Sequence, residues 1–158
     1  MTEIILIAVV VCIGWLLIRS QKQNKQLAET NRSAGSDFLK MNAEKPEVST
    51  TASGLQYEIL QTGSGSEHPQ ASDKVRVHYH GTLIDGRVFD SSVDRGEPIS
   101  FGLNQVIKGW TEGVQLMVVG EKRRLFIPAD LAYGNGSAGI ITPGSTLIFE
   151  VELLAINP

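Results

Sequence analysis

A glycine cluster and a histidine pair are the first features of this sequence whose residue types and spacing could do chemistry. Residues 134–139 (GNGSAG) have the glycine spacing of a dinucleotide-binding loop, but residues 140–144 (IITPG) follow and cannot begin the helix whose amino terminus would bind a pyrophosphate. His78 and His80 lie two residues apart on one strand face and could bind a metal, yet no third ligand of suitable type is close in sequence. We therefore expect a surface loop and a solvated strand face, with neither cofactor nor metal.

Composition and charge exclude several other classes of function. With 158 residues the chain is too short for a multi-domain enzyme with a large cofactor fold. Cys12, the single cysteine, lies in an apolar run, so no intramolecular disulfide and no cysteine metal cluster is possible. Residues 46–158 carry eight basic and thirteen acidic side chains, which makes this part a poor ligand for a phosphate backbone. We expect no nucleic-acid partner.

The unusual feature is a set of aromatic and large aliphatic residues in a chain that is only 6% aromatic: Tyr79, Phe89, Phe101, Val106, Ile107, Trp110, Tyr133, Ile140, Ile141 and Phe149. Asp90 directly follows Phe89, in a segment that otherwise suits a strand. A small domain with few aromatics should bury them, so one interpretation is that these residues only form a core. The other is that they line an apolar pocket.

Alternating apolar and polar residues predict the strands that would position this set. Residues 75–80 alternate with period two, and residues 147–153 do so more clearly, with Leu147, Phe149 and Val151 on one face. The pair Asp85–Gly86 between two apolar segments predicts a tight hairpin. A further short strand is expected over residues 124–127, where Pro128 ends it.

One helical stripe interrupts these strands. Ile107, Trp110, Val114 and Met117 are spaced three, four and three residues apart, as on the apolar face of a short amphipathic helix. We therefore predict an α+β domain from about residue 48 to 158, in which a twisted antiparallel β-sheet wraps around one short α-helix.

Four sequence blocks resemble one known family. They are residues 77–92 (VHYHGTLIDGRVFDSS), 106–110 (VIKGW), 127–134 (IPADLAYG) and 146–153 (TLIFEVEL). In this order and at this spacing they are similar to FKBP-type peptidyl-prolyl cis-trans isomerases, and the resemblance extends from about residue 51 to 157. The family fold is the same sheet wrapped on one helix.

The resemblance implies a role for each member of the aromatic set. The catalytic residues would be Tyr79, Phe89, Asp90, Trp110, Tyr133 and Phe149, and the substrate-binding residues would be Phe101, Val106, Ile107, Ile140 and Ile141. Trp110 would form the floor under a proline ring, Tyr133 would offer its hydroxyl to a ligand carbonyl, and Asp90 would be the one ionisable group of the inner pocket. Three features of the pocket rim depart from the commonest human-type sequence pattern of the family. Ile99 stands where an aromatic residue is usual, Gln105 stands where an acidic residue is common, and the loop 135–138 is one residue shorter. They bear on partner choice and on affinity for the macrolides tacrolimus and rapamycin.

The reaction implied by the family needs no nucleophile. Resonance opposes rotation of an X–Pro bond by about 18–20 kcal/mol, and an apolar enclosure that fits the twisted imide better than either planar form lowers this barrier. We expect proline-containing polypeptides as clients and a role in protein folding. Two alternatives stay open: a binding module or chaperone of the same fold with weak catalysis, and an unrelated sheet domain whose aromatics are core.

The amino-terminal 47 residues form two further segments. Residues 4–18 (IILIAVVVCIGWLLI) carry no charge and predict a single membrane-spanning anchor over residues 1–18, because the run has neither the basic start nor the small-residue cleavage site of a secretory signal. Residues 19–47 are polar and predict a stalk that is partly helical and partly flexible, with a possible short docking helix at residues 38–41. The start of the domain at residues 53–57, preceded by residues 38–43, is similar to that of bacterial family members that carry an amino-terminal helical extension.

Four basic residues follow the apolar run within fifteen residues, and no basic residue precedes it. Because basic residues beside a span stay in the cytoplasm, we expect the carboxyl-terminal domain on the cytoplasmic side of the membrane. Related bacterial isomerases are often exported, which makes the periplasm the alternative.

Overall fold

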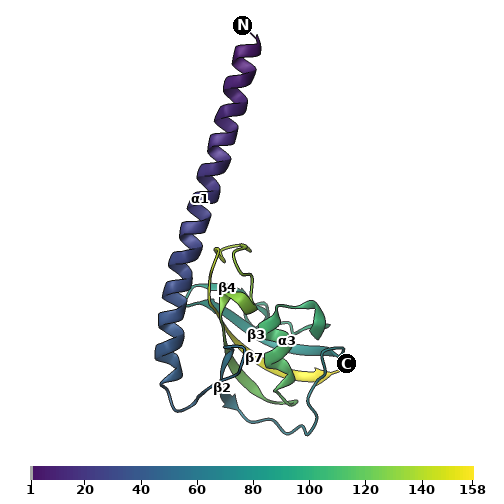
Figure 1. Cartoon of the computed structure of the whole chain (residues 1–158). Coiled ribbons are helices and arrows are strands. Elements are labelled where there is room, and N and C mark those ends of the chain that lie inside the picture. Colours follow the sequence, from purple (N-terminus) through teal and green to yellow (C-terminus); the bar gives the residue numbers. More distant parts are fainter. Residues whose placement is uncertain (1) are drawn as a thin grey trace.

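The computed structural model describes the backbone of residues 2–158 and the side chains of residues 13–158. A long helix, α1 (Thr2–Ala43), leads into an antiparallel sheet that curls around a short helix, α3 (Lys108–Gln115) (Figure 1). The strands are β1 (Val48–Thr50), β2 (Gln56–Gln61), β3 (Lys74–Leu83), β4 (Val88–Ser91), β5 (Ile99–Gly102), β6 (Lys122–Ile127) and β7 (Leu147–Ile156). Short helical turns are α2 (Ser92–Arg95), η1 (Leu103–Gln105) and η2 (Ala129–Leu131). The predicted fold class of the domain is confirmed.

Strands β3 and β7 form the centre of the sheet. The strand order is β1-β2-β6-β7-β3-β4, and β5 also pairs with β3. Val75, Val77 and Tyr79 of β3 are buried and alternate with more exposed neighbours, as the period of two predicted. Phe149 of β7 lies opposite Gly81 of β3, so both long strands direct apolar side chains to the same concave face.

The hairpin predicted at Asp85–Gly86 joins β3 to β4. Leu83 N–H donates to the Arg87 carbonyl at 2.9 Å, and Gly86 has φ of 89°, which a residue with a side chain adopts only at a cost. Ser91 then ends β4 and caps α2, because its hydroxyl accepts a hydrogen bond from the Asp94 N–H.

Two glycines let α3 approach the sheet closely. A Cβ at Gly113 would lie 2.8 Å from Leu125 Cδ1, and a Cβ at Gly109 would collide with Ile127. Both glycines are one turn apart on the buried face of α3. The absence of side chains there brings Trp110 and Val114 down onto the concave face of the sheet.

Gly113→Val should lower the free energy of unfolding by about 1–3 kcal/mol, because the added methyl groups overpack against Leu125. The measurement is urea denaturation followed by circular dichroism. Lys108→Val, at an exposed position of α3, is the control and should change stability by less than about 0.5 kcal/mol. Equal stability of the two variants would contradict this account of the packing.

Helix α1 has two parts with different surroundings. At 1.5 Å per residue its 42 residues span about 63 Å, and Figure 1 shows the amino-terminal part projecting away from the sheet while the carboxyl-terminal part lies along it. Among the residues with described side chains, no helix combines the length and apolar character needed to cross a bilayer. The expected span is residues 4–18, and the side chains of most of it, residues 4–12, are not among those that the structure describes.

The carboxyl-terminal part of α1 corrects the prediction of a partly flexible stalk. Ala28, Gly35 and Asn42, spaced by seven residues, are buried against the domain, and the Phe38 ring packs 6.0 Å from the Phe126 ring. Burial of a stripe of small residues and one asparagine is invisible to a hydrophobicity pattern, which is why the sequence indicated a spacer. The possible docking helix at residues 38–41 is a segment of this longer helix, and its Met41 is 72% exposed.

Candidate functional site

A pocket of about 720 Å³ opens on the concave side of the sheet, above α3. Its lining consists of Tyr79, Phe89, Asp90, Ile99, Phe101, Gln105, Val106, Ile107, Trp110, Tyr133, Ala138, Gly139, Ile141 and Phe149. The structure thus brings together every residue singled out from the sequence except Ile140. The volume is typical of sites that enclose a small ligand or a short peptide segment.

Trp110, in the first turn of α3, forms the floor of this pocket. It is 4% exposed, and the rings of Tyr79, Phe101 and Phe149 stand around it at centroid distances of 5.4, 5.3 and 5.2 Å. These are edge-to-face arrangements, which aromatic rings prefer to flat stacking. Each ring therefore packs against its neighbours, and the floor is already formed without a ligand.

Phe89 of β4 and Phe149 of β7 form one wall. Their centroids are 5.2 Å apart with the ring planes at 82°. Both rings pack over Gly81 of β3, where a Cβ would lie 2.6 Å from Phe89 Cζ and 2.9 Å from Phe149 Cε1. A glycine at this point of the central strand creates the space that the wall occupies.

The polar side of the pocket is a hydrogen-bonded group of three side chains. The Tyr79 hydroxyl and the Arg95 guanidinium both donate to the Asp90 carboxylate, one to each oxygen, and Arg95 Nη2 also donates to the Tyr79 oxygen at 3.1 Å. Arg95 further lies over the Tyr79 ring, 5.9 Å from its centroid. The Asp90 carboxylate is therefore engaged at both oxygens.

These contacts set the ionisation of the group. Partial burial by itself would raise the pKa of the Asp90 carboxyl, but the hydrogen bonds from Tyr79 and Arg95 and the charge of Arg95 outweigh burial and lower it below 3.8. Burial and the neighbouring Asp90 carboxylate raise the pKa of the Tyr79 phenol above 10.0. At neutral pH Asp90 is an anion and Tyr79 is neutral.

The sequence reasoning missed Arg95. A basic residue five positions after Asp90 was the available signal, but only the one-turn helix α2 folds the chain back so that Arg95 faces the carboxylate. Ala138 and Gly139 also line the pocket unexpectedly.

Ile140 was predicted to bind substrate, and the structure places it elsewhere. Ala138 and Ile141 pair as an isolated bridge, so Gly139 and Ile140 form the tip of a tight turn. Ile141 consequently points inward and is 4% exposed, whereas Ile140 is 44% exposed and is absent from the lining.

The two strand histidines have protein partners on one side of the sheet. His78 Nδ1 lies 3.0 Å from the Ser92 hydroxyl, and His80 Nδ1 lies 2.9 Å from the Ser91 hydroxyl. Among the described residues no three side chains of metal-binding type come together. Both histidines lie on β3 and contact the junction of β4 and α2.

Two family models match the chain. The model described as FKBP-type peptidyl-prolyl cis-trans isomerase matches residues 65–154, and the model described as the domain amino terminal to it matches residues 14–59. The second match covers α1 from residue 14 onward, β1 and most of β2, which sequence reasoning had divided among an anchor, a stalk and the domain.

Named relatives agree with this assignment. The chain is 56% identical over 136 residues to the FKBP-type peptidyl-prolyl cis-trans isomerase FkpA of Aeromonas hydrophila, covering 86% of this chain and 50% of that protein. It is 50% identical to the FKBP-type 22 kDa isomerase of Escherichia coli, with 87% and 67% coverage. The chain thus spans about half the length of the first of these relatives.

Solved structures show the same fold. The crystal structure of FkpA from Escherichia coli superimposes with a TM-score of 0.83 at 46% identity, over 87% of this chain and 64% of that one. A peptidyl-prolyl cis-trans isomerase from Pseudomonas syringae superimposes with a TM-score of 0.75 at 40% identity, over 82% and 96%. This chain belongs to the FKBP-type peptidyl-prolyl cis-trans isomerase family.

Proposed function

We propose that the chain catalyses cis-trans isomerisation of X–Pro peptide bonds in protein clients, and that the reaction takes place in the pocket above Trp110. The observation that carries this function is the closely packed aromatic enclosure around Trp110, in which the one lining carboxylate already accepts two hydrogen bonds. Such a site provides a defined apolar surface around the imide and has no free nucleophile. Isomerisation needs only these, because no bond is broken.

In the proposed mechanism the proline ring lies on Trp110, between the walls formed by Phe149 and Tyr79. When the imide twists, resonance is lost and the carbonyl becomes less polar, so a dry pocket favours the twisted form over the planar ones. The Ile107 N–H at the start of α3 and the Tyr133 hydroxyl at the rim would hold the flanking peptide carbonyls. Asp90 would orient Tyr79 and Arg95 and transfer no proton.

The test is isomerisation of a short X–Pro peptide with an apolar X, followed by NMR exchange spectroscopy with the full chain in detergent. We expect exchange well above the uncatalysed rate. Tacrolimus should compete for the pocket, more weakly than in animal relatives because Ile99 replaces an aromatic at the rim. Peptide binding without faster exchange would instead support the weakly catalytic binding module, and absence of both would refute the proposed function.

Replacing Asp90 with asparagine should reduce kcat/KM by less than about tenfold, because a proton-transfer role would contribute about 10²–10⁴-fold. The rate of the unmodified chain should also be flat between about pH 5 and 8. The pKa of Asp90 is lowered, so the ionised form persists throughout this range and is lost only as the pH falls through a value below 3.8. A bell-shaped profile that this substitution abolishes would assign Asp90 a proton-transfer role.

We also propose that residues 1–18 anchor the chain in a membrane, ahead of residues 19–47 and the isomerase domain at residues 48–158. Ile13, Trp15, Leu16, Leu17 and Ile18 are each more than half exposed. At 100° per residue these positions surround the helix, and a helix that is apolar on all sides is typical of a membrane span and not of a seam between two helices. A relative from Legionella longbeachae, 49% identical, is named an outer membrane protein, which agrees with a membrane location and favours the periplasmic alternative for the domain.

The basic residues Arg19, Lys22, Lys25 and Arg32 favour the cytoplasmic side for the domain. Two reporters fused after Pro158, one active only in the cytoplasm and one only outside it, test this orientation. Activity of the external reporter alone would reverse it, and a cleaved product would refute the anchor.

A further inference from the structure

One wall of the pocket is a segment between η2 and β7 that belongs to no helix or long strand. We call residues 132–146 the pocket loop; Tyr133, Ala138, Gly139 and Ile141 line the pocket from it. Between η2 and β7 its internal bonds include the Ala138–Ile141 bridge and a 2.8 Å bond from Gly144 N–H to the Gly134 carbonyl. Most of residues 133–140 are exposed. A segment of this kind needs outside contacts to keep one conformation.

Helix α1 supplies such contacts. Asn31 Nδ2 donates to the Thr142 hydroxyl at 2.9 Å and to the Pro143 carbonyl at 2.7 Å, immediately after the pocket residue Ile141. In the next position along the helix, Arg32 Nε donates to Asn135 Oδ1 of the loop at 3.1 Å, and Arg32 Nη1 forms a 2.8 Å ion pair with Asp130 of η2, just before the loop. Two adjacent residues of α1 therefore hold the pocket loop on both sides of its bridge.

The backbone of the loop is shaped for this helix. Gly144 has φ of 77°, and a Cβ at that position would collide with the backbone of Ala28. One helical turn further on from Asn31, a Cβ at Gly35 would collide with the Thr146 hydroxyl. A glycine in the loop and a glycine in α1 thus allow the two backbones to approach closely where α1 crosses the end of the loop.

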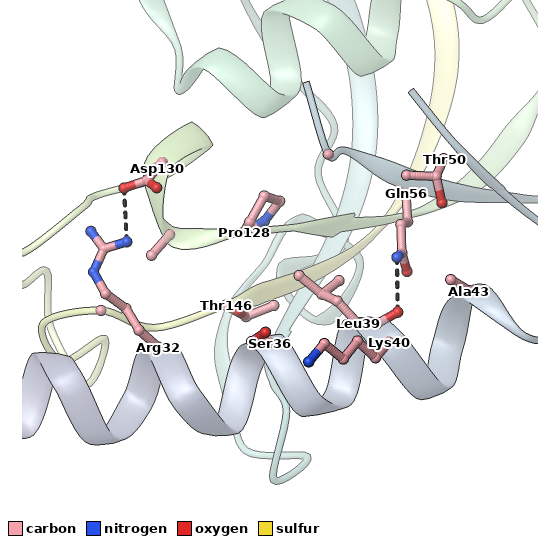
Figure 2. Close-up of a pocket in the computed structure, with 13 residues that line it drawn as sticks. Arg32, Ser36, Leu39, Lys40, Ala43, Thr50, Gln56, Pro128, Asp130 and Thr146 are labelled. Carbon is pink, nitrogen blue, oxygen red and sulfur yellow. Dashed lines mark hydrogen bonds and ion pairs between the residues drawn. The ribbon is translucent and has the colours of Figure 1, made fainter. Parts of the chain in front are cut away.

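The contacts of Asn31 and Arg32 lie at one end of the α1 interface, and the contacts that dock α1 on β2 and β6 lie at the other. Figure 2 shows the Arg32–Asp130 pair at one end of the interface and the 2.9 Å bond from Gln56 Nε2 to the Leu39 carbonyl at the other, with Ser36 and Lys40 between them. A cavity of about 390 Å³ lies in this region. Loss of the loop contacts should therefore leave α1 attached through Phe38 and Leu39.

We propose that Asn31 and Arg32 are positioning residues of the isomerase site: α1 holds the pocket loop in the conformation that receives the peptide. This inference rests on the proposed function. A loop that is already ordered binds peptide with a smaller loss of conformational entropy, so the helix lowers KM. Asn31 and Arg32 do not line the pocket, and their hydrogen bonds and ion pair go to the loop and to Asp130, so kcat should be nearly independent of α1.

The experiment compares the full chain with Asn31→Ala, Arg32→Ala and the double variant, using Thr30→Ala as the matched control. Thr30 is exposed on the same turn of α1, and its hydroxyl bonds only to the Gln26 carbonyl of its own helix. Each single loop variant should raise KM about three- to tenfold with kcat within about twofold, as expected for loss of one or two hydrogen bonds. Thr30→Ala should match the unmodified chain.

Amide hydrogen exchange provides a second readout that does not depend on activity. The Ala138 and Ile141 amides, which form the loop bridge, should exchange faster in Asn31→Ala, while amides of β3 and β7 keep their protection. Unchanged loop exchange, or equally accelerated exchange in β3 and β7, would overturn the inference. An active chain whose variants keep the original KM would overturn it as well, whereas inactivity of the unmodified chain would refute the proposed function itself.

Discussion

Trp110→Ala should reduce kcat/KM about tenfold or more and should also lower stability by about 3–5 kcal/mol. The activity loss follows from contact area: a proline ring that loses about 60 Å² of apolar contact loses about 1.5 kcal/mol at 25 cal/mol per Å², which corresponds to roughly tenfold in rate. The stability loss follows from the cavity, because Trp110 is 4% exposed and touches the rings of Tyr79, Phe101 and Phe149.

The two effects can be separated experimentally. Trp110→Leu keeps part of the volume and should fold at 25 °C, so its kcat/KM reports the loss of the flat aromatic floor. Near-ultraviolet circular dichroism would establish that the remaining aromatic residues keep their environment. Met117→Ala is a matched control, because Met117 is fully buried in the same core but does not line the pocket; it should lower stability by about 2–5 kcal/mol and leave kcat/KM within about twofold. Full activity of a folded Trp110→Leu variant would contradict the proposed role of the floor.

Arg123→Met should lower the free energy of unfolding by about 3–5 kcal/mol, which is a large part of the stability of a domain of this size. Arg123 of β6 is buried with Glu121, its Nε bonds Glu121 Oε1 at 2.6 Å, and its guanidinium lies 4.6 Å from the centre of the Tyr57 ring. Without the arginine, the Glu121 carboxylate would stay buried with only the Val118 N–H as a hydrogen-bond donor.

The neighbouring residue provides the control for this prediction. Arg124 pairs with Glu58 and Glu150 on the other face of β6, where its side chain is 34% exposed. Arg124→Met should therefore cost about 1 kcal/mol or less. Urea denaturation of both variants, followed by intrinsic fluorescence, decides the matter. A loss for Arg123→Met no larger than that for Arg124→Met would show that burial does not set the strength of this ion pair.

The sequence by itself determined β3, β4, β6, β7 and α3, whereas β1, β2, β5 and α2 were not predicted from it. A residue period of two fixes which side of a strand is buried, so Val75, Val77 and Tyr79 could be assigned to one face before any pairing was known. The stripe Trp110, Val114 and Met117 indicated the helix for the same reason, and Asp85–Gly86 indicated a turn that requires positive φ. These are local properties of the chain, and neighbouring residues specify them.

The grouping of the site residues depended on a resemblance and not on local pattern. Tyr79, Trp110 and Phe149 are separated by 31 and 39 residues in the chain, and nothing in their own periodicity distinguishes a pocket from a core. They meet because β7 inserts between β6 and β3 and because Gly109 and Gly113 bring α3 close to β6. Only the resemblance to an established family told these residues apart from ordinary core residues.

Tertiary structure alone decided three further features. Arg95 reaches Asp90 because α2 reverses the chain, Ile140 leaves the pocket because the Ala138–Ile141 bridge turns it outward, and α1 docks beside the pocket loop. Each depends on hydrogen bonds or on close approach at glycine, as at Asn31 and Gly144, and not on the spacing of apolar side chains. Hydrophobic periodicity reports burial of apolar area, so contacts made of hydrogen bonds and glycine backbones leave no trace in it.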